Sequence, residues 1–253
     1  GEKRVEHCDA AIFALGGASW PRLGSDGSWQ AAFAERGASI APLKPSNSGF
    51  LISWSDIFKG KFAGEPIKRM RLKFGNLEAR GEAMVTGYGI EGGAIYALSP
   101  QLRDAIEAKG SAGLEIDLLP DMTQDALAAK LSVGLKDSMA NRLRKIGLSP
   151  VAASLIREDE GGPVLPTAPG DLARRIKGVR LRLTGVAPIE RSISTAGGIS
   201  WDSLNTDYSL KADPSTFVCG EMLDWEAPTG GYLLQACFAT GRAAAHGVIR
   251  RLD

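Results

Sequence analysis

The segment with the clearest chemical potential is "CGEMLDWEAPTGGYLLQACFATGRAA" near the C-terminus. An apolar run ends there on Gly220 and Glu221, an acidic loop follows, and a helical pattern begins after Gly230 and Gly231. The N-terminus of a helix carries unpaired backbone N–H groups and a partial positive charge, so it stabilises anions. Glycines let a ligand approach the backbone closely. The part of the ligand that approaches could be a phosphate or the electron-rich edge of a heteroaromatic ring. Glu221 or Asp224 could accept hydrogen bonds from sugar or sugar-alcohol hydroxyls.

A single Gly-Gly pair more often belongs to an ordinary capped helix with turn glycines. Two further segments, however, combine the same features: "LGGASWPRLGSDG", which contains Gly16 and Gly17, and "GYGIEGG". Three glycine-rich turns between a strand and a helix are hard to attribute to turn geometry alone. Their repetition favours ligand binding.

The elements around the first of these turns are typical of an α/β fold. "AAIFAL", residues 10–15, is a short continuous apolar run, which indicates a strand buried on both faces of a parallel sheet. After the glycines, we expect Ser25 or Asp26 to cap a helix that carries Trp29 and Phe33. The order strand, glycine turn, helix is found in sheets that hold a ligand at their carboxyl edge.

The middle of the chain follows a different pattern. Residues 44–122 form short, partly alternating segments separated by Gly, Pro and Asn, which predict an antiparallel sheet or small barrel. Residues 123–178 have helical spacing, and residues 179–200 return to strands. The sequence therefore predicts an α/β domain built from residues 1–43 and 201–253, with an inserted β-rich, barrel-like domain and a small helical subdomain.

Composition narrows the possible functions. The chain has 253 residues, and 30 Lys and Arg balance 29 Asp and Glu, so a polyanion or an anionic membrane is not expected as the main partner. The three cysteines and two histidines have no metal-ligand spacing, so we expect no metal site. No apolar run is long enough to span a membrane and no signal peptide is evident, which favours a cytoplasmic protein. Oligomeric state cannot be read from these features.

Basic clusters keep one alternative open. "NRLRKIG", "ARRIKGVRLRL" and "IRRLD" could belong to a nucleotide-binding or RNA-binding module. The clusters lack interleaved aromatic residues, and exposed basic helix faces are usually only solvated. We therefore do not expect nucleic acid as a partner, and a phosphate-bearing nicotinamide cofactor would account for the arginines equally well.

Four ordered segments resemble the signature blocks of a family of bacterial flavoproteins. The family includes NAD(P)/FAD-dependent, aminoacetone-oxidase-like and BaiN-like oxidoreductases, with bile-acid dienone reductases as relatives. The segments are "ALGGASWPRLGSDGSWQAAFAERGASIAPLKPS", "AMVTGYGIEGGAIYALS", "STAGGIS" and "CGEMLDWEAPTGGYLLQACFATGRAA". The resemblance spans nearly the whole chain and implies a discontinuous, Rossmann-like FAD-binding domain. It also implies an oxidoreductase that passes electrons or hydride between NAD(P)H or an organic donor and a small unsaturated or carbonyl substrate.

The resemblance also implies which residues surround FAD. Gly16 and Gly17 would lie by the nucleotide, and Gly220 and Glu221 would face the ribityl and pyrophosphate part. The flavin would be bordered by residues around the start of the last helix, namely Asp224, Thr229, Gly230, Gly231 and Tyr232. The dipole of that helix would favour the anionic reduced ring.

Two departures from the family pattern qualify this prediction. Many relatives have Asn shortly after Gly-Gly-Tyr, where this chain has Leu233 and Leu234. The family's N-terminal βαβ unit, with its Gly-x-Gly-x-x-Gly turn, is absent from the sequence, which suggests an N-terminally incomplete chain. No catalytic acid or base can be named, although Tyr88, Glu91, Trp225 and Tyr232 are candidates for contact with a flavin or substrate. The alternative is a non-catalytic fragment that does not retain FAD.

Overall fold

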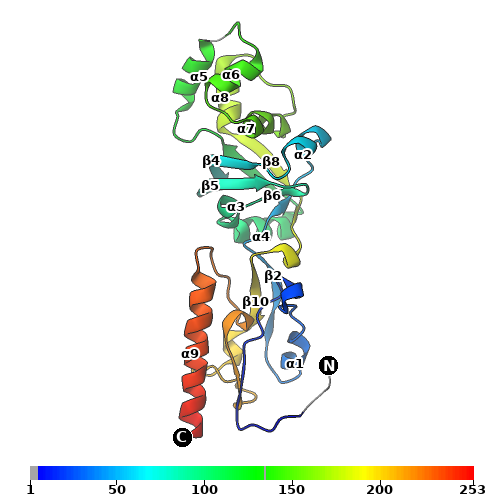
Figure 1. The fold of residues 1–253 in the computed structure, drawn as a ribbon, viewed down its shortest axis with the longest axis vertical. Coiled ribbons are helices and arrows are strands. Elements are labelled where there is room, and N and C mark those ends of the chain that lie inside the picture. Colours follow the sequence, from blue (N-terminus) through cyan, green and yellow to red (C-terminus); the bar gives the residue numbers. More distant parts are fainter. Residues whose placement is uncertain (1–4, 134) are drawn as a thin grey trace. The chain divides into compact units, whose positions relative to one another are not determined.

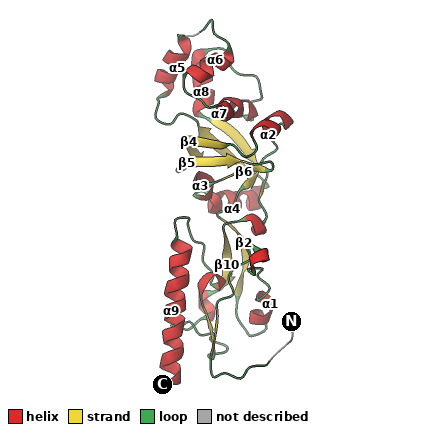
Figure 2. Ribbon diagram, in the orientation of Figure 1, coloured by secondary structure: helices red, strands yellow, loops and turns green. Residues whose placement is uncertain are grey.

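A computed structural model describes residues 5–133 and 135–253 and shows a mixed α/β protein (Figures 1 and 2). The chain divides into two compact units, Gly1–Asn47 with Pro188–Asp253 and, between them in sequence, Ser48–Ala187. Both ends of the chain therefore contribute to one unit and the middle forms the other. The predicted α/β class is confirmed. No helix in the described ranges is both long and apolar enough to cross a bilayer.

The first unit contains two small sheets and one long helix. Its elements are β1 (Ala11–Phe13), η1 (Pro21–Leu23), α1 (Gln30–Ala34), β2 (Ile40–Ser46), η3 (Ile189–Arg191), β10 (Ser194–Ile199), η4 (Trp201–Ser203), β11 (Thr216–Val218), η5 (Gly220–Met222) and α9 (Tyr232–Leu252). Strands β1 and β11 are parallel, with Ala11 opposite Thr216 and Phe13 opposite Val218. Strands β2 and β10 are antiparallel. The parallel pair joins segments from opposite ends of the sequence.

The burial of strand β1 differs from the prediction. Neighbouring side chains on a strand point to opposite faces. Phe13 packs edge-on against Phe33 at 5.2 Å, whereas Ile12 is 43% exposed. The expectation of a strand buried on both faces is therefore wrong for the chain as described, because only the face that carries Phe13 is covered.

The first short helix also begins differently from the prediction. Helix α1 begins at Gln30, and its N-cap Trp29 makes no side-chain capping bond. Asp26 Oδ1 instead accepts a hydrogen bond from the N–H of Ser28, two residues away, so the carboxylate stabilises a local turn. The expectation of Ser25 or Asp26 as the helix cap is wrong for this reason.

Helix α9 packs on the unit through small residues. Thr240, Ala244 and Gly247 are its buried positions, while Leu234 and Phe238 are exposed. A Cβ at Gly247 would lie 2.3 Å from the carbonyl oxygen of Asp207, so only glycine permits this close approach. The helix can therefore lie directly against the loop that precedes β11.

The second unit is built on one antiparallel sheet. Its elements are β3 (Phe50–Leu51), α2 (Asp56–Phe62), β4 (Pro66–Phe74), β5 (Leu77–Val85), β6 (Gly89–Glu91), α3 (Gly93–Tyr96), α4 (Ser99–Lys109), β7 (Ala112–Asp117), α5 (Gln124–Ser132), α6 (Met139–Lys145), α7 (Pro150–Leu155), η2 (Ile156–Glu158), α8 (Pro169–Lys177), β8 (Val179–Leu183) and β9 (Gly185–Val186). The strand order is β8-β7-β4-β5-β6-β3-β9. Helices α5 to α8 gather at one end of this unit (Figure 1). The antiparallel strands and the helices share one hydrophobic core.

Candidate functional site

The carboxyl edge of the β1–β11 pair brings two of the glycine-rich turns together. Because the strands are parallel, both end at the same edge, β1 at Phe13 and β11 at Val218. Strand β1 continues toward Gly16 and Gly17, and β11 continues into Cys219 and the single turn η5. Two segments about 200 residues apart in sequence therefore meet where α/β proteins hold their ligands.

Glu221 links these segments through its carboxylate. Its Oε2 accepts a hydrogen bond from the N–H of Gly17 at 3.2 Å, and its Oε1 accepts one from the N–H of Thr195 at 2.9 Å. The Thr195 hydroxyl oxygen in turn accepts hydrogen bonds from the N–H groups of Ala18 at 2.9 Å and Ser19 at 3.1 Å. One carboxylate and one hydroxyl thus hold the β1 turn, β10 and η5 together.

Thr195 was not among the residues predicted for the site. It lies in "STAGGIS", a segment that carried the family resemblance, so its position was marked but its role was not. The segment is polar yet closely packed, with Ser194 and Thr195 only 2% and 1% exposed. A buried hydroxyl beside two glycines is the signal that could have indicated a backbone partner.

Gly17 must be glycine because its neighbours leave no space. A Cβ there would lie 2.4 Å from the Thr195 hydroxyl oxygen and 3.0 Å from the Glu221 carboxyl carbon. The absence of a side chain at Gly17 is therefore required by contacts within the protein. Gly16 is different, since its φ of +76° is itself a reason for glycine.

Burial raises the pKa of the Glu221 carboxyl, and the hydrogen bonds from Thr195 and Gly17 oppose part of that rise. Desolvation is the larger effect, because removal from water disfavours the charged form. The site therefore holds a carboxyl group that protonates more readily than an exposed glutamate.

A buried hydroxyl beside Gly16 has no partner. The Oγ of Ser25 makes no hydrogen bond with any described residue, and a Cβ at Gly16 would lie 2.9 Å from it. The carbonyl of Gly16 accepts a hydrogen bond from Trp29 Nε1 at 2.9 Å, so the turn is fixed on its other side. Sequence reasoning considered Ser25 only as a helix cap, and the structure instead leaves its donor and acceptor capacity unused.

The start of α9 has the backbone expected for an uncapped helix N-terminus. Gly231 is the N-cap with φ of +88°, and Gly230 has φ of +106°. No side chain caps the helix, and a Cβ at Gly231 would meet nothing within 4 Å, so backbone conformation and not crowding requires glycine there. Thr229 and Tyr232 beside them are exposed.

The predicted site residues fall into two groups. Gly16, Gly17, Gly220 and Glu221 lie at the carboxyl edge of the sheet, where the N–H of Gly220 donates to Thr240 Oγ1 at 3.0 Å. The second group consists of Thr229, Gly230, Gly231 and Tyr232 at the first turn of α9. Thr240 lies eight residues along the helix from Tyr232, which is roughly 12 Å at 1.5 Å per residue.

Asp224 lies between the two groups along the chain. Its N–H donates to the carbonyl of Ile199 at 2.9 Å, and its carbonyl accepts from Trp201 Nε1 at 2.8 Å. Both bonds involve the backbone, so they fix the position of the residue and leave its half-buried carboxylate available. Asp224 is therefore held where β10 ends.

The third glycine-rich turn, "GYGIEGG", belongs to the second unit. A Cβ at Gly89 would lie 1.9 Å from the carbonyl oxygen of Phe50, so the pairing of β6 with β3 requires this glycine. Tyr88 donates a short hydrogen bond to Glu91 Oε2. Burial, with a smaller contribution from the Glu91 charge, raises the pKa of Tyr96. This turn thus contains an acidic and a phenolic group in contact, in a different compact unit from the other two turns.

The cysteines near the site are not poised for reaction. Burial raises the pKa of the Cys219 and Cys237 thiols, so little thiolate forms at neutral pH. In the described ranges, no three His, Cys, Asp or Glu side chains group closely enough to hold a metal ion.

Several of the basic residues considered for nucleic acid have partners within the second unit. Arg175 pairs with the buried Asp159 at 2.9 Å, and Lys177 pairs with the buried Asp117 at 2.7 Å. Arg142 donates to the carbonyl of Leu131 at 3.2 Å. These cations stabilise the inside of the unit.

The chain is similar to known proteins over nearly its whole length. The chain is 26% identical over 262 residues to a 3-dehydro-bile acid delta(4,6)-reductase of Clostridium scindens. The match covers 96% of this chain and 63% of the relative, so the chain spans less than two thirds of that protein's length. A family model described as "HI0933-like protein Rossmann domain" matches residues 2–247. The chain therefore belongs to the HI0933-like Rossmann-domain family.

Proposed function

We propose that this chain forms part of an FAD-dependent oxidoreductase. One observation carries the proposal: the parallel strands β1 and β11 end in two glycine turns that are joined by the Gly17–Glu221 hydrogen bond. This is the position at which dinucleotides bind in Rossmann-like sheets. Membership of a Rossmann-domain family and similarity to a protein named as a reductase support the same class.

The residues of the first unit fit an elongated ligand with phosphates and hydroxyls. The unpartnered Ser25 hydroxyl beside Gly16 can donate to a phosphate or accept from a sugar hydroxyl. The uncapped start of α9 supplies backbone N–H groups about 12 Å along the helix from Thr240. A short ligand could not contact both Gly220, whose N–H is bonded to Thr240, and the start of α9, whereas a dinucleotide could.

Four of the predicted residues have a task in this proposal. Asp224 and the free lone pairs of Glu221 would accept hydrogen bonds from hydroxyls, and Gly230 and Gly231 would admit the ring to the helix N-terminus. FAD, when bound, supplies the capacity to accept and deliver hydride. The N-terminus of α9 carries the positive end of the helix dipole, so it would stabilise negative charge on a ring bound beside Gly230 and Gly231.

Absorption spectroscopy tests the proposal directly. The 253-residue chain is incubated with excess FAD and desalted, and its spectrum is recorded between about 350 and 500 nm, where flavins absorb. We expect retained flavin bands, and a spectrum without them would contradict FAD binding by this chain. Gly231→Val should lower the retained flavin. Gly110→Val is the matched control, because Gly110 also has positive φ and open space but ends α4 in the second unit.

We further propose that the electron donor is NAD(P)H or a reduced organic compound and that the acceptor is a small unsaturated or carbonyl substrate. The name of the relative, a delta(4,6)-reductase, supports reduction of carbon–carbon double bonds. Anaerobic mixing of the flavin-loaded protein with NADH or NADPH should bleach the flavin. An unchanged spectrum with both would direct the search to organic donors.

A further inference from the structure

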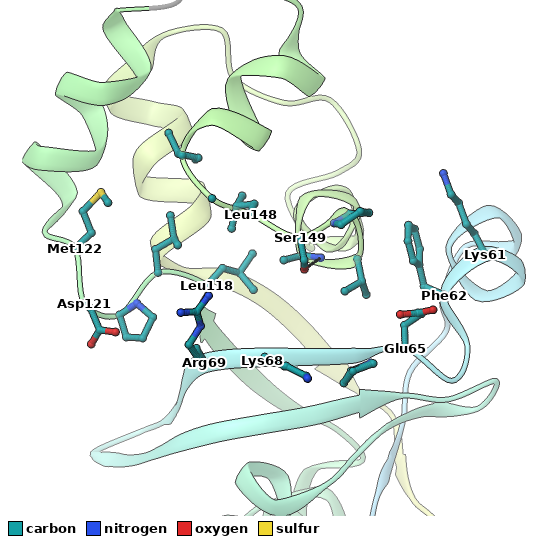
Figure 3. Close-up of a pocket in the computed structure, with 18 residues that line it drawn as sticks. Lys61, Phe62, Glu65, Lys68, Arg69, Leu118, Asp121, Met122, Leu148 and Ser149 are labelled. Atoms are coloured by element: carbon teal, nitrogen blue, oxygen red, sulfur yellow. Dashed lines mark hydrogen bonds between the residues drawn. The ribbon is translucent and has the colours of Figure 1, made fainter.

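The second unit contains a large cavity that the FAD proposal does not use. Its volume is about 890 Å³, within the range of small-molecule sites. It lies between α2, β4, the segment after β7 and the loop that joins α6 to α7 (Figure 3). We propose that this cavity binds a free amphipathic organic anion, an apolar body that carries one carboxylate, sulfonate or phosphate group.

The inner wall of the cavity is apolar. It is formed by buried side chains from four different segments, namely Phe62, Leu118, Ile146, Leu148 and Val151. These side chains belong to the core of the unit, so the wall is fixed by packing. An apolar surface of this kind favours a hydrocarbon body and contributes nothing to the binding of a bare inorganic ion.

Arg69, an exposed residue of the lining, places positive charge at the open side of this apolar space. Strand β4 has an irregularity in its pairing with β5 between Ile67 and Met70, where two residues, Lys68 and Arg69, face the single residue Glu82. Such a bulge redirects side chains. It keeps both Ile67 and Met70 in the core, each 1% exposed, and turns Arg69 toward Leu118 and Leu148 (Figure 3).

The backbone of Arg69 is unusual for its residue type. Its φ is +53°, in the left-handed region that glycine, asparagine and aspartate normally occupy. Glycine would satisfy the bulge with less strain. Residues held in such conformations cluster at ligand sites and active sites, which supports a functional role for the Arg69 side chain.

The cations at the cavity differ from their neighbours on the same strand. Arg71 pairs with Asp117, and Lys73 pairs with Glu78. Lys68 and Arg69, in contrast, form no ion pair with any carboxylate of the described chain.

The other charged residues of the lining leave the cavity positive. Lys61 adds a third cation at the rim, and the carboxylates are Glu65 and Asp121. Asp121 accepts a hydrogen bond from Arg80 at 3.2 Å, so its charge is already paired. The guanidinium of Arg69 can bind a carboxylate or phosphate through two parallel hydrogen bonds, and Lys68 can add a point charge.

Calorimetric titration with decanoate tests the proposal on the whole 253-residue chain. We expect saturable binding at one site, with decanol and acetate each at least about tenfold weaker, because each lacks either the charge or the apolar body. Equal binding of decanol would overturn the role of the cations, and absence of saturable decanoate binding would overturn the site. Binding only to phosphatidylglycerol vesicles would identify a membrane surface and would also overturn a free ligand.

Arg69→Gly separates binding from folding. Glycine suits the positive φ, so the variant should melt at a temperature no lower than the parent while its affinity for decanoate falls at least about tenfold. Arg69→Lys should keep part of the affinity through its charge. The matched control is Arg182→Ala, which removes an exposed arginine from β8 outside the cavity and should leave binding unchanged. Unchanged affinity in Arg69→Gly, or an equal loss in Arg182→Ala, would refute the assignment.

Discussion

Glu221 accepts a hydrogen bond from the backbone N–H of Gly17, a residue 204 positions earlier in the chain. Its other carboxylate oxygen accepts from Thr195. The contact closes the first unit at the carboxyl edge of its parallel strands. One side chain therefore connects the fold to the proposed ligand site, and changes at Glu221 should affect both.

Removal of the Glu221 carboxylate should destabilise the first unit. Glu221→Ala leaves the N–H groups of Gly17 and Thr195 without their acceptor, so we expect a loss of about 1–3 kcal/mol in the free energy of unfolding. Urea unfolding followed by circular dichroism measures this change. Glu82→Ala, on an exposed side chain of β5, is the control and should change stability by about 0.5 kcal/mol or less. An unaffected Glu221→Ala variant would show that the carboxylate does not hold the fold.

The stability contribution of Glu221 should depend on pH in a defined direction. Its pKa is raised in the folded state by burial, so the folded protein binds the proton more tightly than the unfolded chain. The contribution is therefore fully present below the ordinary carboxyl pKa of roughly 4 to 5 and declines as pH rises through the raised value. Glu221→Gln should lack this decline. Unfolding free energies of both proteins across this range test it, and parallel pH profiles would contradict it.

Gly17 should tolerate no side chain. The Cβ of Gly17→Ala would lie 2.4 Å from the Thr195 hydroxyl oxygen, and we expect destabilisation of about 1–3 kcal/mol from overpacking. Gly113→Ala is the matched control, because that Cβ would meet nothing within 4 Å on β7. Thermal unfolding of the two variants compares them. Equal melting temperatures would mean that the β1 turn can move away from β10.

Glycine at position 69 should stabilise the second unit. The left-handed conformation of Arg69 costs roughly 1–2 kcal/mol, and the greater freedom of unfolded glycine offsets roughly 0.5–1 kcal/mol of the relief. Arg69→Gly should therefore raise the free energy of unfolding by about 1 kcal/mol or less, whereas the β-branched Arg69→Val should lower it. A clear loss of stability in Arg69→Gly would indicate that the arginine side chain itself stabilises the strand.

The three cysteines should react at different rates. Cys8 is exposed, while burial raises the thiol pKa of Cys219 and Cys237. Iodoacetamide at neutral pH should therefore modify Cys8 first, and alkylation of the other two should become faster as pH rises. Mass spectrometry of peptides over time measures each rate. Rapid alkylation of Cys237 at neutral pH would contradict its raised pKa.

Local sequence patterns determined where several helices, strands and glycine turns of this protein lie. Helical spacing predicted α9 to within two residues of its start, and alternating segments predicted the antiparallel strands of the second unit. The glycines at 16, 17, 230 and 231 were recognised because they stand between an apolar run and a helical pattern. The structure adds that 16, 230 and 231 have positive φ and that 17 has no space for a side chain. Periodicity and glycine content are properties of neighbouring residues, so a single sequence reveals them.

Only the tertiary structure decided what those residues contact. Thr195 became a partner of Glu221, and Ser25 became an unpartnered hydroxyl beside Gly16. Ile12 is exposed because no described residue covers its face of β1. The bulge that directs the Arg69 side chain toward the cavity likewise depends on the register between β4 and β5. Register and long-range packing arise from many weak contacts between distant segments, and local sequence patterns do not encode them separately.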